Sequence, residues 1–474
     1  MLRRSTLLFL ACSLSFTAQA SLEKAAQLYE RSSNNVQQYT KIAEELIEDK
    51  LYSSALPFAK EYLTSAGKIN SNEIDELVDT LVPYTGIRQF ETMPVNVLAR
   101  TKAPMLRYIL AKKYFRLGKY NEALGELGDN IPRKHSVKPY ALFLEGSILS
   151  MTQKYLQANN VYKECVDVAE SALGKEKDPH RIRQLTITRD YCLVGIPRSD
   201  FANKNFESAI LGYLDLSKSS YIWPEVLFEE AWASFYSKDY NRTLGKLVTY
   251  KAPILTWMFN PEVEVLKALT YMELCLWQDT KKVVDDFYGK FEAPSEEFNR
   301  FLEKNSKDYR YYYNLANTMV QNRLAANDLT TMVLRNVLRD PTFMELWQAM
   351  EKGKEEIDTI KGVRSASFRH FLVNNLNETL LSQRDLIGAY VRKGLLNYQD
   401  QLSRAFEGMS YIKLEVLGKR KSEILSDEAN SERARGNIKY LRRNDKQYFW
   451  DFNGEFWADE LGDYAFALKS ECRK

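Results

Sequence analysis

Residues that could carry out chemistry are concentrated near the C-terminus. Between Tyr448 and Tyr464, seven aromatic residues stand among acidic ones. Aromatic rings beside carboxylates are typical of sugar-binding clefts, and Asp451, Glu455 and Asp459 could supply the paired acids of a glycosidase. These three acids lie within nine consecutive residues, whereas a catalytic pair usually comes from separate elements around a cleft. A noncatalytic protein is therefore favoured, and a helical protein that binds or processes cell-wall glycan is the alternative.

Motifs of other enzymes and of metal sites do not occur in the sequence. His135, His180 and His370 are far apart, none begins an HExxH motif, and no CxxC is present. A glycine-rich phosphate loop and a strand–turn–helix nucleophile motif are missing as well. We therefore predict no catalytic residue, no metal site and no cofactor. The 66 basic and 63 acidic residues nearly balance, which argues against a nucleic-acid partner.

Residues 1–20 have the plan of a secretory signal peptide. Arg3-Arg4 supplies positive charge, residues 7–16 are mostly apolar, and Ala18-Gln19-Ala20 offers a small-x-small cleavage site. The apolar stretch is too short for the roughly 20 residues of a membrane span. We expect a periplasmic protein with no transmembrane segment after cleavage. Cys12 follows Leu10-Ala11, so lipidation at this cysteine stays open.

A three-position pattern recurs six times and predicts how most of the chain folds. In each copy, an aromatic residue lies three positions before a small residue, and a further position, small in five of the six copies, lies twelve residues before that one. The aromatic and small residues are Tyr52 and Ala55, Tyr120 and Ala123, Tyr155 and Ala158, Phe206 and Ala209, Tyr240 and Thr243, and Trp277 and Thr280. The earlier positions are Ala43, Ala111, Gly146, Pro197, Ala231 and Ala268. Because small residues let two helices approach to about 8 Å, the pattern predicts paired antiparallel helices.

The spacing of the six copies gives the size of the unit. Successive small residues are 68, 35, 51, 34 and 37 positions apart, which indicates a unit of about 34 residues. The first interval then contains a degenerate unit near residues 70–103, and the interval of 51 contains an insertion near residues 166–188. One unit cannot bury its apolar face alone, so the units are expected to stack into a solenoid.

These stretches resemble the tetratricopeptide repeat (TPR) family, most clearly at Leu110–Leu127, Leu144–Tyr162 and Glu229–Leu247. The resemblance implies an all-α fold, a TPR-like α-solenoid of antiparallel helix pairs, with a concave groove that binds segments of protein partners. It does not identify the residues that line the groove. The whole layout, including Phe452–Tyr464, also looks like periplasmic TPR proteins of gliding and predatory bacteria, some of which belong to motility machines of the envelope.

Four cysteines follow the signal segment, at Cys165, Cys192, Cys275 and Cys472. In an exported chain they permit two disulfides in three connectivities, among which the sequence cannot choose. Cys165 and Cys192 are the first pair to test, because they bracket the predicted insertion. Buried free thiols are the alternative.

The C-terminal third is expected to contain long helices. All thirteen prolines lie at or before Pro341, and proline interrupts helices. A heptad seam is formed by residues that repeat every seven positions, namely Leu395, Leu402, Met409 and Val416. Packing of this seam on the chain's own helices is favoured, and a homodimer through residues 391–419 stays open.

The tail that follows is rich in aromatic residues, and a free segment this apolar would aggregate. It must therefore dock on its own helices or on a partner. The candidate docking residues are Trp450, Phe452, Phe456 and Trp457. Asn453-Gly454 is a turn signal, and Glu455–Tyr464 is compatible with a short helix.

The sequence thus predicts five segments: a signal peptide (1–20), TPR-like helical repeats (21–290), a helical extension (291–365), long helices with a short heptad seam (366–446) and an aromatic-rich tail (447–474). We expect an exported protein–protein interaction scaffold of a cell-envelope complex, with motility as one possible context. Its partners are expected to be envelope proteins.

Overall fold

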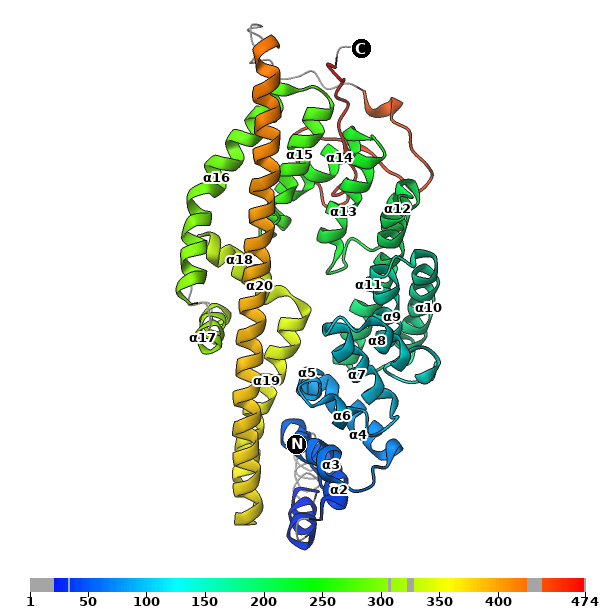
Figure 1. The fold of residues 1–474 in the computed structure, drawn as a ribbon, viewed down its shortest axis with the longest axis vertical. Coiled ribbons are helices and arrows are strands. Elements are labelled where there is room, and N and C mark those ends of the chain that lie inside the picture. Colours follow the sequence, from blue (N-terminus) through cyan, green and yellow to red (C-terminus); the bar gives the residue numbers. More distant parts are fainter. Residues whose placement is uncertain (1–20, 33–34, 306–307, 322–327, 424–436, 473–474) are drawn as a thin grey trace, which may run out of the picture. The chain divides into compact units, whose positions relative to one another are not determined.

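A computed structural model describes residues 21–32, 35–305, 308–321, 328–423 and 437–472 (Figure 1). The predicted signal segment, Cys12 included, lies outside these residues. The chain forms two compact units. Unit 1 comprises residues 1–152, 164–188 and 340–390, and unit 2 comprises residues 153–163, 189–339 and 391–474.

Within the described residues, the regular elements of unit 1 are all helices. Residues 21–32 are helical. The helices that follow are η1 (Val36–Gln38), α2 (Tyr39–Glu48), α3 (Tyr52–Ser65), α4 (Ser71–Thr85), α5 (Arg88–Glu91), α6 (Val95–Leu98), α7 (Pro104–Arg116), α8 (Tyr120–Glu126), η2 (Gly128–Asn130), α9 (Lys138–Met151) and α19 (Pro341–Lys361). Three helices contribute residues to both units: α10 (Tyr155–Leu173), α11 (Pro179–Ala202) and α20 (Ala366–Glu423).

Within its described residues, unit 2 consists of helices and one two-stranded sheet. The helices are α12 (Phe206–Tyr213), α13 (Trp223–Tyr236), α14 (Tyr240–Val248), η3 (Thr249–Lys251), η4 (Pro253–Leu255), α15 (Glu262–Glu273), α16 (Trp277–Lys304), α17 (Tyr309–Val320), α18 (Leu329–Arg339) and η5 (Ile438–Tyr440). Strands β1 (Trp450–Asp451) and β2 (Tyr464–Ala465) pair in parallel. None of the described helices is both long enough and apolar enough to cross a membrane.

The same turn joins the two helices of all six predicted repeats. Each aromatic residue of the pattern is the first residue of the second helix. Two positions before it, the backbone takes a positive φ of 57° to 72°, at Lys50, Gly118, Gln153, Lys204, Lys238 and Cys275. A single residue in this left-handed conformation ends a helix and reverses the chain. The recurrence of one turn geometry confirms the TPR-like helix hairpin.

The small residues of the pattern lie where the paired helices cross. In the α2–α3, α7–α8, α13–α14 and α15–α16 hairpins, the two small positions are fully buried. Thr243 and Thr280 fit because each hydroxyl donates to the carbonyl four residues earlier, on Asp239 and Leu276 respectively. The fold class predicted from the sequence, an all-α TPR-like solenoid, is confirmed.

The two irregular intervals have different structures. Residues 70–103 form one regular helix, α4, followed by the single-turn helices α5 and α6. The extra residues of the longer interval lengthen helices instead of forming a separate element, because α10 has 19 residues and α11 has 24.

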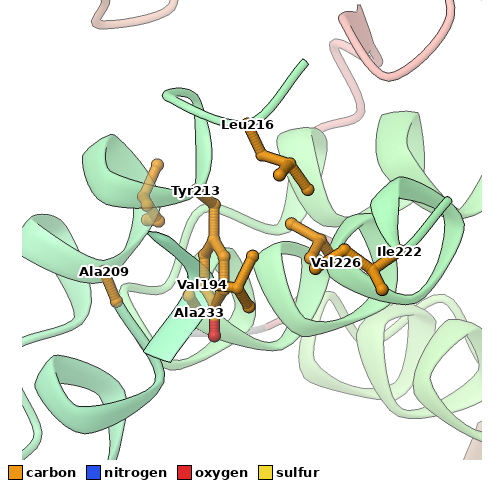
Figure 2. Packing of buried hydrophobic residues seen from close by; sticks show 8 residues of the cluster. Val194, Ala209, Tyr213, Leu216, Ile222, Val226 and Ala233 are labelled. Atoms are coloured by element: carbon orange, nitrogen blue, oxygen red, sulfur yellow. The ribbon is translucent and has the colours of Figure 1, made fainter. Parts of the chain in front are cut away.

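A compact apolar cluster joins α11, α12 and α13 in unit 2. Figure 2 shows the Tyr213 ring directed toward Val194 and Ala233. Ala209, the small residue of this repeat, lies in the same cluster and is fully buried. The aromatic ring thus fills the space that small neighbours leave open.

The heptad seam of α20 packs within unit 2. Leu395, Leu402 and Met409 are at most 3% exposed, and the Phe406 ring meets Phe287 of α16 at a centroid distance of 5.0 Å. A Cβ added to Gly408 would lie 3.0 Å from Val265 of α15, so glycine permits a close approach. The seam therefore serves the chain's own packing, as the sequence favoured. A homodimer through residues 391–419 stays a prediction.

Candidate functional site

The tail, defined here as residues 447–472, lies along the helices of unit 2. Figure 1 shows it, in red, passing α14 and α15. In the β1–β2 pair, Trp450 is opposite Tyr464, and the Trp450 N–H donates to the Asp463 carbonyl over 3.0 Å. The expectation that Glu455–Tyr464 could form a short helix is wrong. Residues 455–463 contain a turn but no helix, and Gly462 takes a φ of +85°, which is incompatible with a continuous helix.

Four apolar side chains of the tail are buried against the helices. Phe452, Leu461, Tyr464 and Phe466 are between 2% and 9% exposed. They pack with Leu244 of α14, Ala252, Leu274 and Leu276. Removing such side chains from water stabilises the docked tail by about 1.5–3 kcal/mol each. The helix surface that contacts the tail is called the tail-binding surface below.

Asn241 at the start of α14 binds the tail as a neighbouring strand would. Its backbone carbonyl accepts from the Phe466 N–H at 3.1 Å. Its side-chain Oδ1 accepts from the Leu468 N–H at 2.8 Å, and its Nδ2 donates to the Leu468 carbonyl at 3.3 Å. Further along, the Leu274 carbonyl accepts from the Glu471 N–H at 2.9 Å. These bonds involve the tail's backbone, so they hold an extended chain whatever its side chains are.

Gly245 allows the tail to touch the backbone of α14. A Cβ added at this position would lie 1.7 Å from the Tyr464 carbonyl oxygen and 2.3 Å from its carbon. These are backbone atoms, which cannot move aside by a change of rotamer. A glycine inside a helix lowers helix stability. The close contact with the Tyr464 backbone explains why α14 has a glycine at position 245.

Lys246 connects α14, α13 and the tail. Its Nζ lies 2.6 Å from Glu230 of α13 and donates to the Gly462 carbonyl over 2.7 Å, and the two charged side chains are each 8% exposed. Thr249 Oγ1 accepts from the Gly462 N–H at 3.2 Å. Burial raises the pKa of Glu230, and the charge of Lys246 opposes that shift. The pair is therefore a buried ion pair that needs both members.

A disulfide fixes the end of the tail. Cys275 and Cys472, 197 positions apart in the sequence, are joined by an S–S bond. Cys275 occupies the left-handed turn position between α15 and α16, with a φ of 57°. The sequence allowed three ways of joining the four cysteines into two disulfides. Of these three, only the one that pairs Cys165 with Cys192 contains the Cys275–Cys472 bond. Both of these cysteines are fully buried, and their pairing stays a prediction.

The four predicted docking residues divide into two groups. Phe452 and Phe456 pack in the cluster on the tail-binding surface. Trp450 and Trp457 are 43% and 57% exposed, and docking of a partner on them stays a prediction. The residues that bind the tail, Asn241, Gly245 and Lys246, were not predicted. A glycine inside a predicted helix was the one available signal, and the repeat pattern identifies buried positions only.

The tail also borders two hollows of about 460 Å³ each. The first is lined by Lys251, Lys267 and Lys290 together with Phe452 and Phe466. The second lies between the start of α13, the residues around η4 and the other edge of the tail, and its lining is mostly apolar. The acids considered for catalysis, Asp451, Glu455 and Asp459, line neither of these two hollows and are exposed.

Within the described residues, no group of three or more His, Cys, Asp or Glu side chains is arranged to hold a metal ion. The arrangement suits the binding of extended polypeptide. It offers backbone hydrogen-bond partners, apolar contacts for alternate side chains and a buried cation for a carbonyl group.

No family model matches the chain, and no curated protein matches it. One matching solved structure is the crystal structure of the APC/C hetero-tetramer Cut9–Hcn1, with 9% identity, coverage of 81% of this chain and 98% of that chain, and a TM-score of 0.21. Because the TM-score is so low, we draw nothing from this likeness.

Proposed function

We propose that the protein is an exported scaffold for protein–protein interactions in a cell-envelope complex. The observation that carries the proposal is the binding of its own tail. Asn241 and Leu274 hold the tail by its backbone, and Gly245 lets it approach the helix. Helix hairpins that bind one extended segment in this way are suited to binding segments of other proteins.

Two observations support the proposed periplasmic location. Residues 1–20 have the composition of a secretory signal. The Cys275–Cys472 disulfide is of a kind that persists in oxidising compartments and is rare in the cytosol. The sequence resemblance suggests a motility complex as one such envelope assembly. The identity of the captured partner proteins would test this suggestion.

Crosslinking followed by affinity capture tests this function. The full chain carrying a C-terminal affinity tag would be crosslinked in intact cells and recovered from the envelope fraction. We expect a defined set of envelope proteins, lost when the chain is made without residues 1–20. Recovery of cell-wall glycan fragments without proteins would contradict the scaffold and favour the glycan-binding alternative.

A further inference from the structure

The hollow beside the tail, lined by Trp223, Trp257, Ile254 and Leu461 among others, is a mostly apolar recess of about 460 Å³. Leu461 belongs to the tail, and the other three residues belong to the helical part of the unit. The docked tail therefore supplies one wall of the recess. Ile254 is 65% exposed, so the recess is open to solvent, and its apolar surface is available for a partner.

Two cations, Arg339 and Lys218, line this recess. The Arg339 guanidinium lies 4.3 Å from the centre of the Trp257 ring, and the structure's described residues place no carboxylate in an ion pair with it. Stacking on a ring leaves the N–H edges of a guanidinium available for a carboxylate. The second lining cation, Lys218, is already held by Asp463 at 2.7 Å and by the Asp459 carbonyl at 2.8 Å.

The lining contains no Asp or Glu residue. An occupant with a negative charge would thus meet Arg339, while the neighbouring Asp463 carboxylate is paired with Lys218. A bulky apolar side chain would fill the recess, and an acidic residue next to it would accept hydrogen bonds from Arg339. The same unit already holds an extended segment by its backbone a few residues away, at Gly462 and Tyr464.

From this geometry we propose that the recess formed by Tyr221, Trp223, Ile254, Trp257, Arg339 and Leu461 binds a segment of a partner protein in which a large apolar residue adjoins an acidic one. The proposal rests on the scaffold function proposed above and names the chemistry of the partner. Docking of the tail completes the site.

The test uses the full chain and two labelled peptides. One has the sequence Asp-Leu-Phe-Leu-Asp, and in the other both Asp residues are replaced by Lys. Fluorescence anisotropy should show binding of the acidic peptide that is about tenfold tighter than that of the basic one, because a charge-assisted hydrogen bond contributes to one complex only. Arg339→Glu should abolish or reverse this preference.

Ile254→Ser tests the apolar part of the site. Ile254 is largely exposed, so its loss does not threaten the core, and the variant should bind the acidic peptide at least about fivefold more weakly. Leu156→Ser is the matched control, because Leu156 is 76% exposed on α10 and does not line the recess. It should bind like the unaltered protein.

Three results would overturn the proposal: equal binding of the two peptides, unchanged binding by Ile254→Ser, or binding of laurate at Ile254 without binding of either peptide, which would identify an acyl-chain site. Failure here is separable from failure of the scaffold function. If envelope partners are still captured by the full chain, the function stands and only the recess is excluded.

Discussion

Gly245 is the residue at which the tail backbone meets α14. Gly245→Ala would place a Cβ 1.7 Å from the Tyr464 carbonyl oxygen, so we expect the tail to leave its surface, the midpoint of thermal unfolding to fall, and proteases to cleave residues 447–472 faster. Gly289→Ala is the matched control, since nothing beyond the local backbone of α16 lies within 4 Å of its added Cβ. It should stabilise the protein by up to about 1 kcal/mol. A Gly245→Ala protein that behaves like this control would contradict the contact.

Lys246 is predicted to matter through the charge it compensates. Lys246→Met leaves Glu230 buried and unpaired, which should lower the free energy of unfolding by about 3–5 kcal/mol near neutral pH. The pKa of Glu230 is already raised by burial, and it rises further without the lysine. The folded state then binds this proton more tightly than the unfolded state, so the variant regains stability as the pH falls through that pKa.

Urea unfolding of Lys246→Met at about pH 7 and about pH 5 measures this recovery. The double variant with Glu230→Gln is the control, because it has no buried charge and should lose less stability, with little dependence on pH. An equal loss for Lys246→Met at both pH values would show that the ion pair is not the cause.

Helix α20 carries both buried and exposed leucine side chains. Leu402 is 3% exposed in the seam of unit 2, whereas Leu414 is 65% exposed. Leu402→Asp buries an unpaired charge and should cost about 4 kcal/mol or more, while Leu414→Asp should change stability by less than about 0.5 kcal/mol. Thermal unfolding followed by circular dichroism gives both values.

The same melts, repeated over a range of protein concentrations, test the homodimer. Because the seam is filled by the chain's own residues, the unfolding midpoint should not depend on protein concentration. A midpoint that rises with concentration would instead support a dimer through residues 391–419.

The helix hairpins were predictable because their determinants are local. An aromatic residue, a small residue three positions later and another twelve positions earlier recur within single units, and the structure starts the second helix at each aromatic residue. The tail-binding surface was not predictable in this way. Asn241, Gly245 and Lys246 act on residues more than 200 positions away, and such partners leave no periodic signal in the sequence.

The Cys275–Cys472 disulfide ties the tail to the turn between α15 and α16. Cys275→Ser/Cys472→Ser should keep its helical circular dichroism but expose the tail to proteolysis. The loss of stability should reach at most about 5 kcal/mol, the loop-entropy value for so long a loop. Peptide mapping without reduction should recover the linked pair from the unaltered protein, and free thiols at both positions would contradict the bond.

The repeating helix pairs follow from the amino-acid sequence alone, because side-chain size at a crossing and the turn before an aromatic residue are set within about 34 residues. The sequence also determined that the apolar tail must be covered. The position of the tail and the residues that cover it follow only from contacts in the folded chain. That position depends on Gly245, Asn241 and Cys275, whose partners lie about 200 positions away in the sequence.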